Sequence, residues 1–213
     1  MTPDHLQVKI DGMLTNQCDY VITRTKFFNV DKPLGANNYR FNQYELTPYN
    51  YISQAVNWLT CDVCLKSEIA KKLNFNEALQ SGQEFNYFSK LVYISTNYKF
   101  IDQVVSLRRY HTDSIRSKLD SSFKKAQGSF QAKWRTYLDI RAIAERKVRV
   151  VLLKKCLFLI LDHGSKIITD TFKFYRAIFR EYSWRGFYFI GMLISLKLFG
   201  KGHFFYKKII SNY

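Results

Sequence analysis

The charge of this chain is divided unevenly along its length, and this division constrains how it can fold. Residues 1–122 hold 14 Lys and Arg against 12 Asp and Glu, a net charge of +2. Residues 123–213 hold 19 Lys and Arg against 5 Asp and Glu, a net charge of +14. A strongly basic module favours an anionic surface, either nucleic acid or the anionic face of a membrane. The sequence therefore predicts a near-neutral domain over residues 1–120 and a basic domain over residues 121–213.

The basic domain has the residue pattern of helices. No proline follows Pro48, so helices are permitted throughout the second half. Apolar side chains recur there at helical spacing. They form two stripes, one of Phe123, Phe130, Trp134, Tyr137, Leu138 and Ala144 and one of Ile168, Phe172, Tyr175, Phe179 and Tyr182. Aromatic stripes opposite Lys and Arg are typical of helices in a membrane interface. They also suit a small helical bundle, and both hold if one aromatic face stays exposed.

The chain shows no sequence signal for secretion or for crossing a membrane. Residues 1–6 lack the charged start and apolar run of a signal peptide. The longest uncharged apolar run, Gly186 to Leu196, is about half of the roughly 20 residues that span a bilayer. Val150 to Leu161 is also apolar, but Lys154 and Lys155 interrupt it. We expect a cytoplasmic protein that lies peripherally on the inner face of the membrane.

The cysteines do not form a zinc-binding pattern. Cys61 and Cys64 are the only close pair among four, and no second pair or nearby histidine pair completes a four-ligand site. Strand-like alternation over residues 58–65 would place the two on opposite faces. We expect reduced, partly buried thiols.

The first domain shows helical and strand-like segments in alternation, which predicts a mixed α/β fold. Leu6, Ile10 and Met13 or Leu14 give residues 3–16 one apolar helical face. The expected helices are 3–16, 49–56, 67–73 and 81–95, and the expected strands are 19–28, 58–65 and a strand or strand pair over 99–111.

The segment that enters the helix at residues 81–95 supports two interpretations. Ser81 is a suitable N-cap, and Glu84 stands three residues later, as in a capping box. On this interpretation Glu84 has a structural role. The alternative is that its carboxylate lies at the mouth of a cleft and acts as a general base.

The first domain contains four segments of interest, at Thr2–Ile10, Trp58–Ser67, Phe75–Glu84 and Phe100–Ser114. In their order and spacing they resemble segments of family 2 inverting glycosyltransferases with the GT-A fold. Phe75-Asn-Glu-Ala-Leu-Gln-Ser-Gly-Gln-Glu84 is similar to the family segment F-D/N-E-x-L-x-x-G-x-D/E. The other three are the Pro-containing helix Thr2–Ile10, the acceptor-side strand Trp58–Ser67 and the ending Phe100–Ser114. The resemblance covers residues 1 to about 118 and implies the acceptor-side part of a GT-A domain.

The resemblance assigns roles to particular residues. Glu84 matches the catalytic base, which takes a proton from the acceptor hydroxyl, although most members have Asp there. Arg108, Arg109 and Ser114 match positions that contact the donor diphosphate, and His111 matches a histidine that helps to hold a divalent cation, Mg²⁺ or Mn²⁺. Asp62 is a candidate for acceptor contact. On the alternative interpretation, His111 is a surface histidine, and Arg108 and Arg109 are a solvated charge pair.

The sequence also departs from the family. No Asp-x-Asp occurs in it. We expect the chain to lack the N-terminal nucleotide-binding half, which would precede the Pro-containing helix. His111 alone would hold a hard cation poorly, because such cations need several oxygen ligands. The resemblance therefore implies sugar transfer from a nucleotide-sugar donor to a glycan or lipid-linked acceptor by a truncated chain that is inactive alone. A separate N-terminal half would be a further partner.

The competing hypothesis is a non-enzymatic protein that uses its basic C-terminal helices to bind a membrane or nucleic acid. Interleaved basic and aromatic residues can bind single strands by charge and stacking. The sequence contains no recognised RNA- or DNA-binding pattern, which favours the membrane over nucleic acid.

Overall fold

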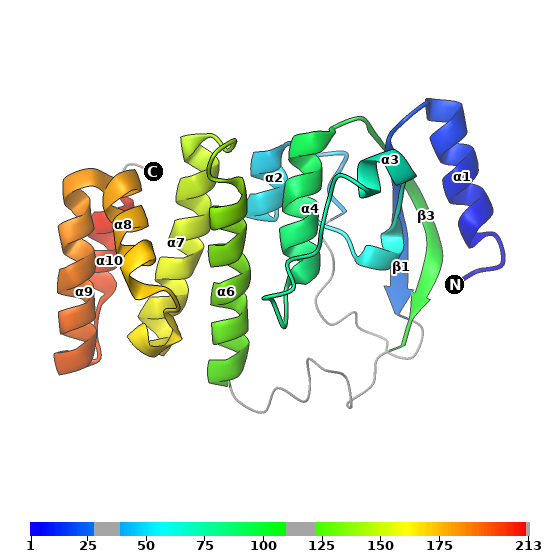
Figure 1. Cartoon of the computed structure of the whole chain (residues 1–213). Coiled ribbons are helices and arrows are strands. Elements are labelled where there is room, and N and C mark those ends of the chain that lie inside the picture. Colours follow the sequence, from blue (N-terminus) through cyan, green and yellow to red (C-terminus); the bar gives the residue numbers. More distant parts are fainter. Residues whose placement is uncertain (28–38, 110–121, 212–213) are drawn as a thin grey trace. The chain divides into compact units, whose positions relative to one another are not determined.

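The computed structural model describes residues 1–27, 39–109 and 122–211 (Figure 1). The chain forms two compact units. The first consists of Met1–Asn76 with Tyr87–Lys118, and the second of Glu77–Asn86 with Leu119–Tyr213. The fold is mixed α/β, with a small sheet and many helices. The two units are described separately below.

The first unit is built on a three-stranded sheet of β1 (Tyr20–Phe27), β2 (Val63–Leu65) and β3 (Tyr98–Arg108). The strand order is β2-β1-β3, with β1 antiparallel to β2 and parallel to β3. Tyr20, Val21 and Ile22 are fully buried, because β1 lies between the other two strands. The register of β1 with β3 shifts between Ile22 and Thr25. The segment predicted as a strand or strand pair is thus one strand as far as Arg108.

The described part of the first unit contains two longer helices, α1 (His5–Asn16) and most of α4 (Gln83–Ile94). It also contains two short helices, α2 (Pro48–Ser53) and α3 (Ser67–Ala70), and a 3-10 turn, η1 (Thr60–Asp62). The expected strand over residues 58–65 is wrong in its first half, where η1 stands instead. Trp58 packs on Tyr51 and Phe88, with ring centroids 4.5 and 5.4 Å away. This aromatic cluster joins α2 to α4.

The helix α1 exposes most of the apolar face that the sequence predicted. Leu6, Ile10 and Leu14 are 64%, 46% and 70% exposed. The buried side chains of α1 are His5 and Lys9. The helix buries this side because His5 and Lys9 find hydrogen-bond partners beneath it, at the carbonyls of Val105 and Cys61.

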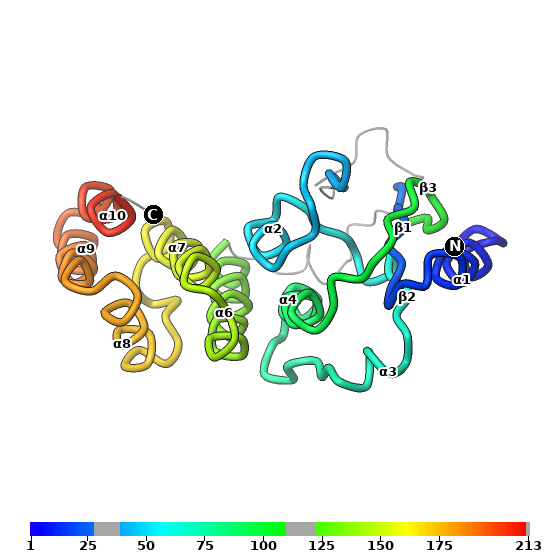
Figure 2. The backbone as a smooth tube through the Cα atoms, turned by 90° about the horizontal axis from the view of Figure 1, so that it is seen from above, coloured from blue at the N-terminus to red at the C-terminus, as the bar shows by residue number. Residues whose placement is uncertain are grey.

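The described part of the second unit is helical, as the sequence predicted (Figure 2). Its helices are α6 (Ser122–Ile140), α7 (Arg146–His163), α8 (Thr171–Tyr182), α9 (Gly186–Phe199) and α10 (His203–Ile210), with 3-10 turns η2 (Ser165–Ile167) and η3 (Ser183–Arg185). The core contains Phe174, whose ring centroid lies 5.3 Å from that of Phe130 and 5.2 Å from that of Trp134. None of the described helices is both long and apolar enough to cross a bilayer.

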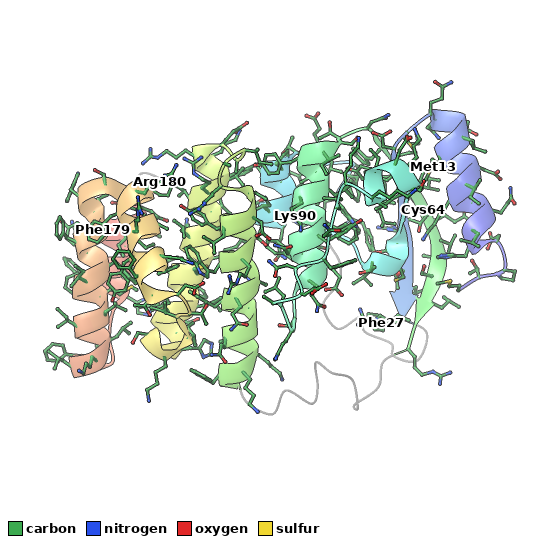
Figure 3. All side chains as sticks on the ribbon, viewed as in Figure 1. Met13, Phe27, Cys64, Lys90, Phe179 and Arg180 are labelled. Atoms are coloured by element: carbon green, nitrogen blue, oxygen red, sulfur yellow. The ribbon has the colours of Figure 1, made fainter. Side chains whose placement is uncertain are left out.

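The two predicted aromatic stripes of the second unit have different outcomes. On α6, Phe130, Trp134 and Tyr137 are buried, as expected for a packed face. On α8 the buried side chains are instead Phe174, Ala177, Ile178, Glu181 and Tyr182. Phe179, labelled in Figure 3, packs edge-on against Phe187 of α9 with ring centroids 5.1 Å apart. Of the predicted stripe on α8, Tyr182 is therefore in the core, Tyr175 and Phe179 are half-buried, and Phe172 is exposed.

Candidate functional site

Glu84 lies in the first turn of α4 and is exposed. The helix begins at Gln83, because Gly82 takes a positive φ of 74° and its carbonyl accepts from the N–H of Asn86 at 3.1 Å. The prediction of Ser81 as N-cap is therefore wrong. Ser81 instead packs against Gly128 of α6, where a Cβ would collide with its Oγ. The carboxylate of Glu84 is thus accessible, and a negative charge in the first turn interacts favourably with the helix dipole.

The buried amide of Asn86 fixes this first turn to α6. Its Nδ2 donates to Thr136 Oγ1 at 3.2 Å and to Asp139 Oδ2 at 2.8 Å. Lys133 of α6 lies 5.9 Å from the centre of the Phe85 ring. These contacts hold the backbone that carries Glu84, and sequence reasoning missed them. The only sequence signal was a polar residue, Asn86, beside an apolar stripe.

Asp62 is fully buried in the first unit. Its carboxylate accepts from the hydroxyl of Thr25, from the Tyr39 hydroxyl at 2.6 Å and from the backbone N–H of Leu59 at 2.7 Å. Burial raises the pKa of Asp62, while these hydrogen bonds and Lys9 oppose the shift. The carboxylate thus ties η1 to β1. The contact with an acceptor suggested for Asp62 stays a prediction.

Lys9 and His5 form a second buried polar group next to Asp62. Lys9 Nζ donates to the Cys61 carbonyl at 2.6 Å and lies 3.3 Å from His5 Nε2. His5 Nδ1 lies 3.0 Å from the Val105 carbonyl, so this nitrogen carries the proton and Nε2 accepts from Lys9. Burial lowers the pKa of Lys9, and the Asp62 charge opposes this. Because these side chains are closed to solvent, they join α1 to β3 and η1 rather than bind a substrate.

An aromatic cavity of about 510 Å³ opens beside β1 and β3. Arg24 and Asp102 form an ion pair across it at 2.6 Å, and Arg24 lies 5.4 Å above the Tyr39 ring. Phe41 stacks on Phe100 with ring centroids 4.4 Å apart. Aromatic faces next to charged groups can hold a ring-shaped polar ligand by stacking and hydrogen bonding. Among the predicted site residues that the structure describes, Asp62, Glu84, Arg108 and Arg109, none lines this cavity.

The remaining predicted site residues lie near the end of β3. Arg108 is exposed, and its guanidinium lies 5.6 Å over the Phe27 ring. Arg109 follows it and is exposed. His111 and Ser114 lie outside the described residues. Arg108, Arg109 and Asp62 belong to the first unit, whereas Glu84 belongs to the second.

The described residues include no group of three His, Cys, Asp or Glu side chains that could hold a metal ion. All four cysteines are free thiols. Thr25 Oγ1 lies 3.2 Å from Cys61 Sγ, so this thiol takes part in the polar group around Asp62.

The helix α9 carries an exposed apolar stripe. It consists of Phe187, Ile190, Ile194 and Leu198, which follow one another at spacings of three, four and four. The side chains of Trp184, Phe199 and Phe204 are also exposed. Figures 1 and 2 show α9 next to α8 and α10. The neighbouring Arg185, Lys197 and Lys201 supply positive charge near this stripe.

Comparisons with protein-family models, with curated proteins and with solved structures found no match to this chain.

Proposed function

We propose that this chain is the acceptor-side part of an inverting glycosyltransferase of the GT-A type, with Glu84 as its general base. The observation that carries the proposal is the exposed carboxylate of Glu84 on a helix turn that Asn86 holds in place. A general base must reach the proton that it removes. Glu84 would take the proton of an acceptor hydroxyl while that oxygen attacks the anomeric carbon of a nucleotide-sugar and the nucleoside diphosphate leaves. The acceptor would be a glycan or a lipid-linked glycan.

The donor side of the reaction would come from a separate nucleotide-binding half. The exposed apolar face of α1, formed by Leu6, Ile10 and Leu14, supports this part of the proposal. Exposed apolar patches of this kind on a folded unit mark interaction surfaces. The described residues offer no cluster of ligands for the divalent cation that the resemblance implies, and His111 lies outside them. In this proposal the donor half holds the cation, and none of the steps above passes through it.

The test is reconstitution with the donor half. The candidate would be sought in the coding DNA upstream of Met1, as an open frame that encodes a βαβ unit ending in Asp-x-Asp. We expect no sugar transfer by residues 1–213 alone and transfer when both polypeptides are present. Nucleoside diphosphate release from a panel of nucleotide-sugars measures turnover.

Variants of two exposed acids separate catalysis from structure. Glu84→Gln should abolish turnover and leave donor binding unchanged. Glu68→Gln is the matched control, because Glu68 is exposed in the first turn of α3, lies outside the four segments of the resemblance and should not affect turnover. Full activity of the Glu84 variant, or transfer by the chain alone, would refute the proposal.

The second candidate function is binding to an anionic membrane surface by the second unit, on the cytoplasmic face. The apolar stripe on α9 favours it over nucleic-acid binding, because lipid chains would cover Phe187, Ile190, Ile194 and Leu198. Burying one such side chain contributes about 1.5–3 kcal/mol, and each Lys or Arg near an anionic surface about 1 kcal/mol.

Vesicle flotation tests this candidate. We expect the protein to float with phosphatidylserine-containing vesicles, less so at high salt, and not to bind RNA under the same conditions. Ile194→Asp should weaken partitioning by at least about tenfold, since it removes one buried side chain and adds a negative charge. Ile143→Asp, at an exposed site between α6 and α7, is the control. Equal partitioning of both variants would exclude the α9 stripe as the lipid contact.

A further inference from the structure

One face of α7 places two lysines within an otherwise apolar row. Val151, Lys154, Lys155, Phe158 and Leu159 follow one another at the spacing of a single helix face. The adjacent face of α7 is fully buried in the core through Leu152, Leu153, Cys156, Leu157 and Ile160. Lys154 and Lys155 are only partly exposed. A row in this position would ordinarily be apolar throughout and covered by a neighbouring helix.

This face lines a cavity of about 380 Å³ within the second unit. Lys133 of α6 and Tyr206 of α10 complete its lining, so three helices contribute to it. Phe158 and Tyr206 meet edge-on with ring centroids 6.3 Å apart. Small-molecule sites commonly have volumes of about 300–1,000 Å³ and apolar walls with a few polar groups. The cavity has this size and this kind of lining.

The polar groups of the cavity are lysines. Lys133 is held in place by Ser129, whose Oγ accepts from its Nζ at 2.7 Å. Burial lowers the pKa of Lys133. Burial and the charge of Lys133 lower the pKa of Lys155 to about 8. Two ammonium groups near each other in a partly desolvated cavity disfavour their charged forms, and a bound anion relieves this cost.

The carboxylates on the same helices have other partners. Asp139 of α6 accepts from Asn86 at 2.8 Å. Asp162 of α7 is exposed, and its negative charge interacts with the phenol of Tyr206. Burial and this charge raise the pKa of Tyr206. The charged side chains that the described residues contribute to the cavity lining are all lysines.

We propose that this cavity binds an anionic amphiphile with a phosphate headgroup. The phosphate would contact the ammonium groups of Lys133, Lys154 and Lys155, and the attached alkyl or isoprenyl chain would lie along Val151, Phe158 and Leu159. Phosphate suits three ammonium donors because it carries up to two negative charges and several acceptor oxygens. The inference does not depend on the proposed glycosyl transfer, since it rests only on residues of the second unit.

Calorimetric titration of the full chain with three probes tests the proposal. The probes are mono-octyl phosphate below its micelle concentration, inorganic phosphate and octan-1-ol. We expect mono-octyl phosphate to bind at least about tenfold more tightly than either of the others, because each supplies only half of the contacts. Equal affinity for inorganic phosphate would overturn the proposal, because the apolar walls would then contribute nothing.

Substitutions on α7 locate the site. Lys155→Gln should weaken binding of mono-octyl phosphate by about tenfold through loss of one charge-assisted contact. Lys147→Gln is the matched control, because Lys147 is an exposed lysine of α7 that pairs with Glu145 at 2.8 Å. Equal weakening in both variants would show non-specific attraction to the basic surface and overturn the proposal.

Chemical labelling gives a second measurement that needs no variant. A pulse of acetic anhydride followed by peptide mass spectrometry reports the reactivity of each lysine. Mono-octyl phosphate should protect Lys133, Lys154 and Lys155 and leave Lys147 unprotected. Labelling of the three lysines that does not change with the ligand would overturn the proposal.

Discussion

Removing the buried carboxylate of Asp62 should destabilise the first unit severely. In the Asp62→Ala variant, the hydroxyls of Thr25 and Tyr39 and the backbone N–H of Leu59 lose their acceptor. A hydrogen bond to a charged group contributes about 1.5–3 kcal/mol, and a buried donor left without a partner costs about 1–3 kcal/mol. The net loss of stability depends on how many of these donors find another hydrogen-bond partner.

The three donors differ in what they can recover. The Thr25 hydroxyl can turn toward Cys61 Sγ at 3.2 Å, and the half-buried Tyr39 hydroxyl can reach water. The N–H of Leu59 is fixed by the backbone of η1 and keeps the full penalty. Against this, the variant no longer buries a charge, which is the main cause of the raised pKa of Asp62. We expect a net loss of about 3 kcal/mol in the free energy of unfolding of the first unit.

Hydrogen–deuterium exchange measures this loss locally. The amides of β1 should exchange about 100-fold faster in Asp62→Ala, which corresponds to about 3 kcal/mol. The matched control is Asp102→Ala on β3, which breaks the 2.6 Å ion pair with Arg24 of β1. These partners are 65% and 39% exposed, so the control should lose no more than about 1 kcal/mol. Equal acceleration in the two variants would refute the assigned role of burial.

Three further predictions concern other measurable properties. The pKa of Asp62 is raised in the folded state, so the folded protein binds the carboxyl proton more tightly than the unfolded chain does. The stability of the protein relative to Asp62→Asn should therefore be highest near pH 4 and should fall as the pH rises to 8. Urea unfolding at each pH measures this. Gly82→Ala should lower Tm more than Gly164→Ala, because both sites have positive φ but only the Cβ at residue 82 meets a neighbour, Ala132 at 2.5 Å; equal shifts in Tm would contradict the assigned packing. The rate of Lys155 acetylation should rise through a midpoint near pH 8, whereas a midpoint near 10.5 would contradict the burial of this amine.

Helical and strand periodicity predicted most elements of this chain but not how all of them are turned. Phe88, Leu91 and Val92 recur at helical spacing in the sequence, and all three are buried on α4. On α1 the apolar face is exposed instead, at Leu6 and Ile10. Periodicity shows which side chains share a face. Which face is buried was decided by Lys9, whose acceptor at Cys61 lies 52 residues away.

The candidate sites divide in the same way. The position of Glu84 after a turn and at the start of a helix could be predicted from local residue types. Its support by Asn86 could not, because the partners of the amide lie 50 and 53 residues away on α6. The sequence likewise showed Lys154 and Lys155 within an apolar stretch, but only the packing of α6 and α10 against α7 forms a cavity around them.

The assignment of the first turn of α4 to the second unit has a consequence for synthesis and dissection of the protein. Residues 77–86 belong with helices that begin at Ser122. During synthesis these residues leave the ribosome before α6 does. They can pack on α6 only after α6 has also been synthesised. A cut at residue 120 would leave these ten residues on the N-terminal fragment. Asn86 would then lose its hydrogen bonds to Thr136 and Asp139. We expect neither fragment to be as stable as its unit in the intact chain, and a fragment of the second unit would need residues 77–86 supplied as a peptide.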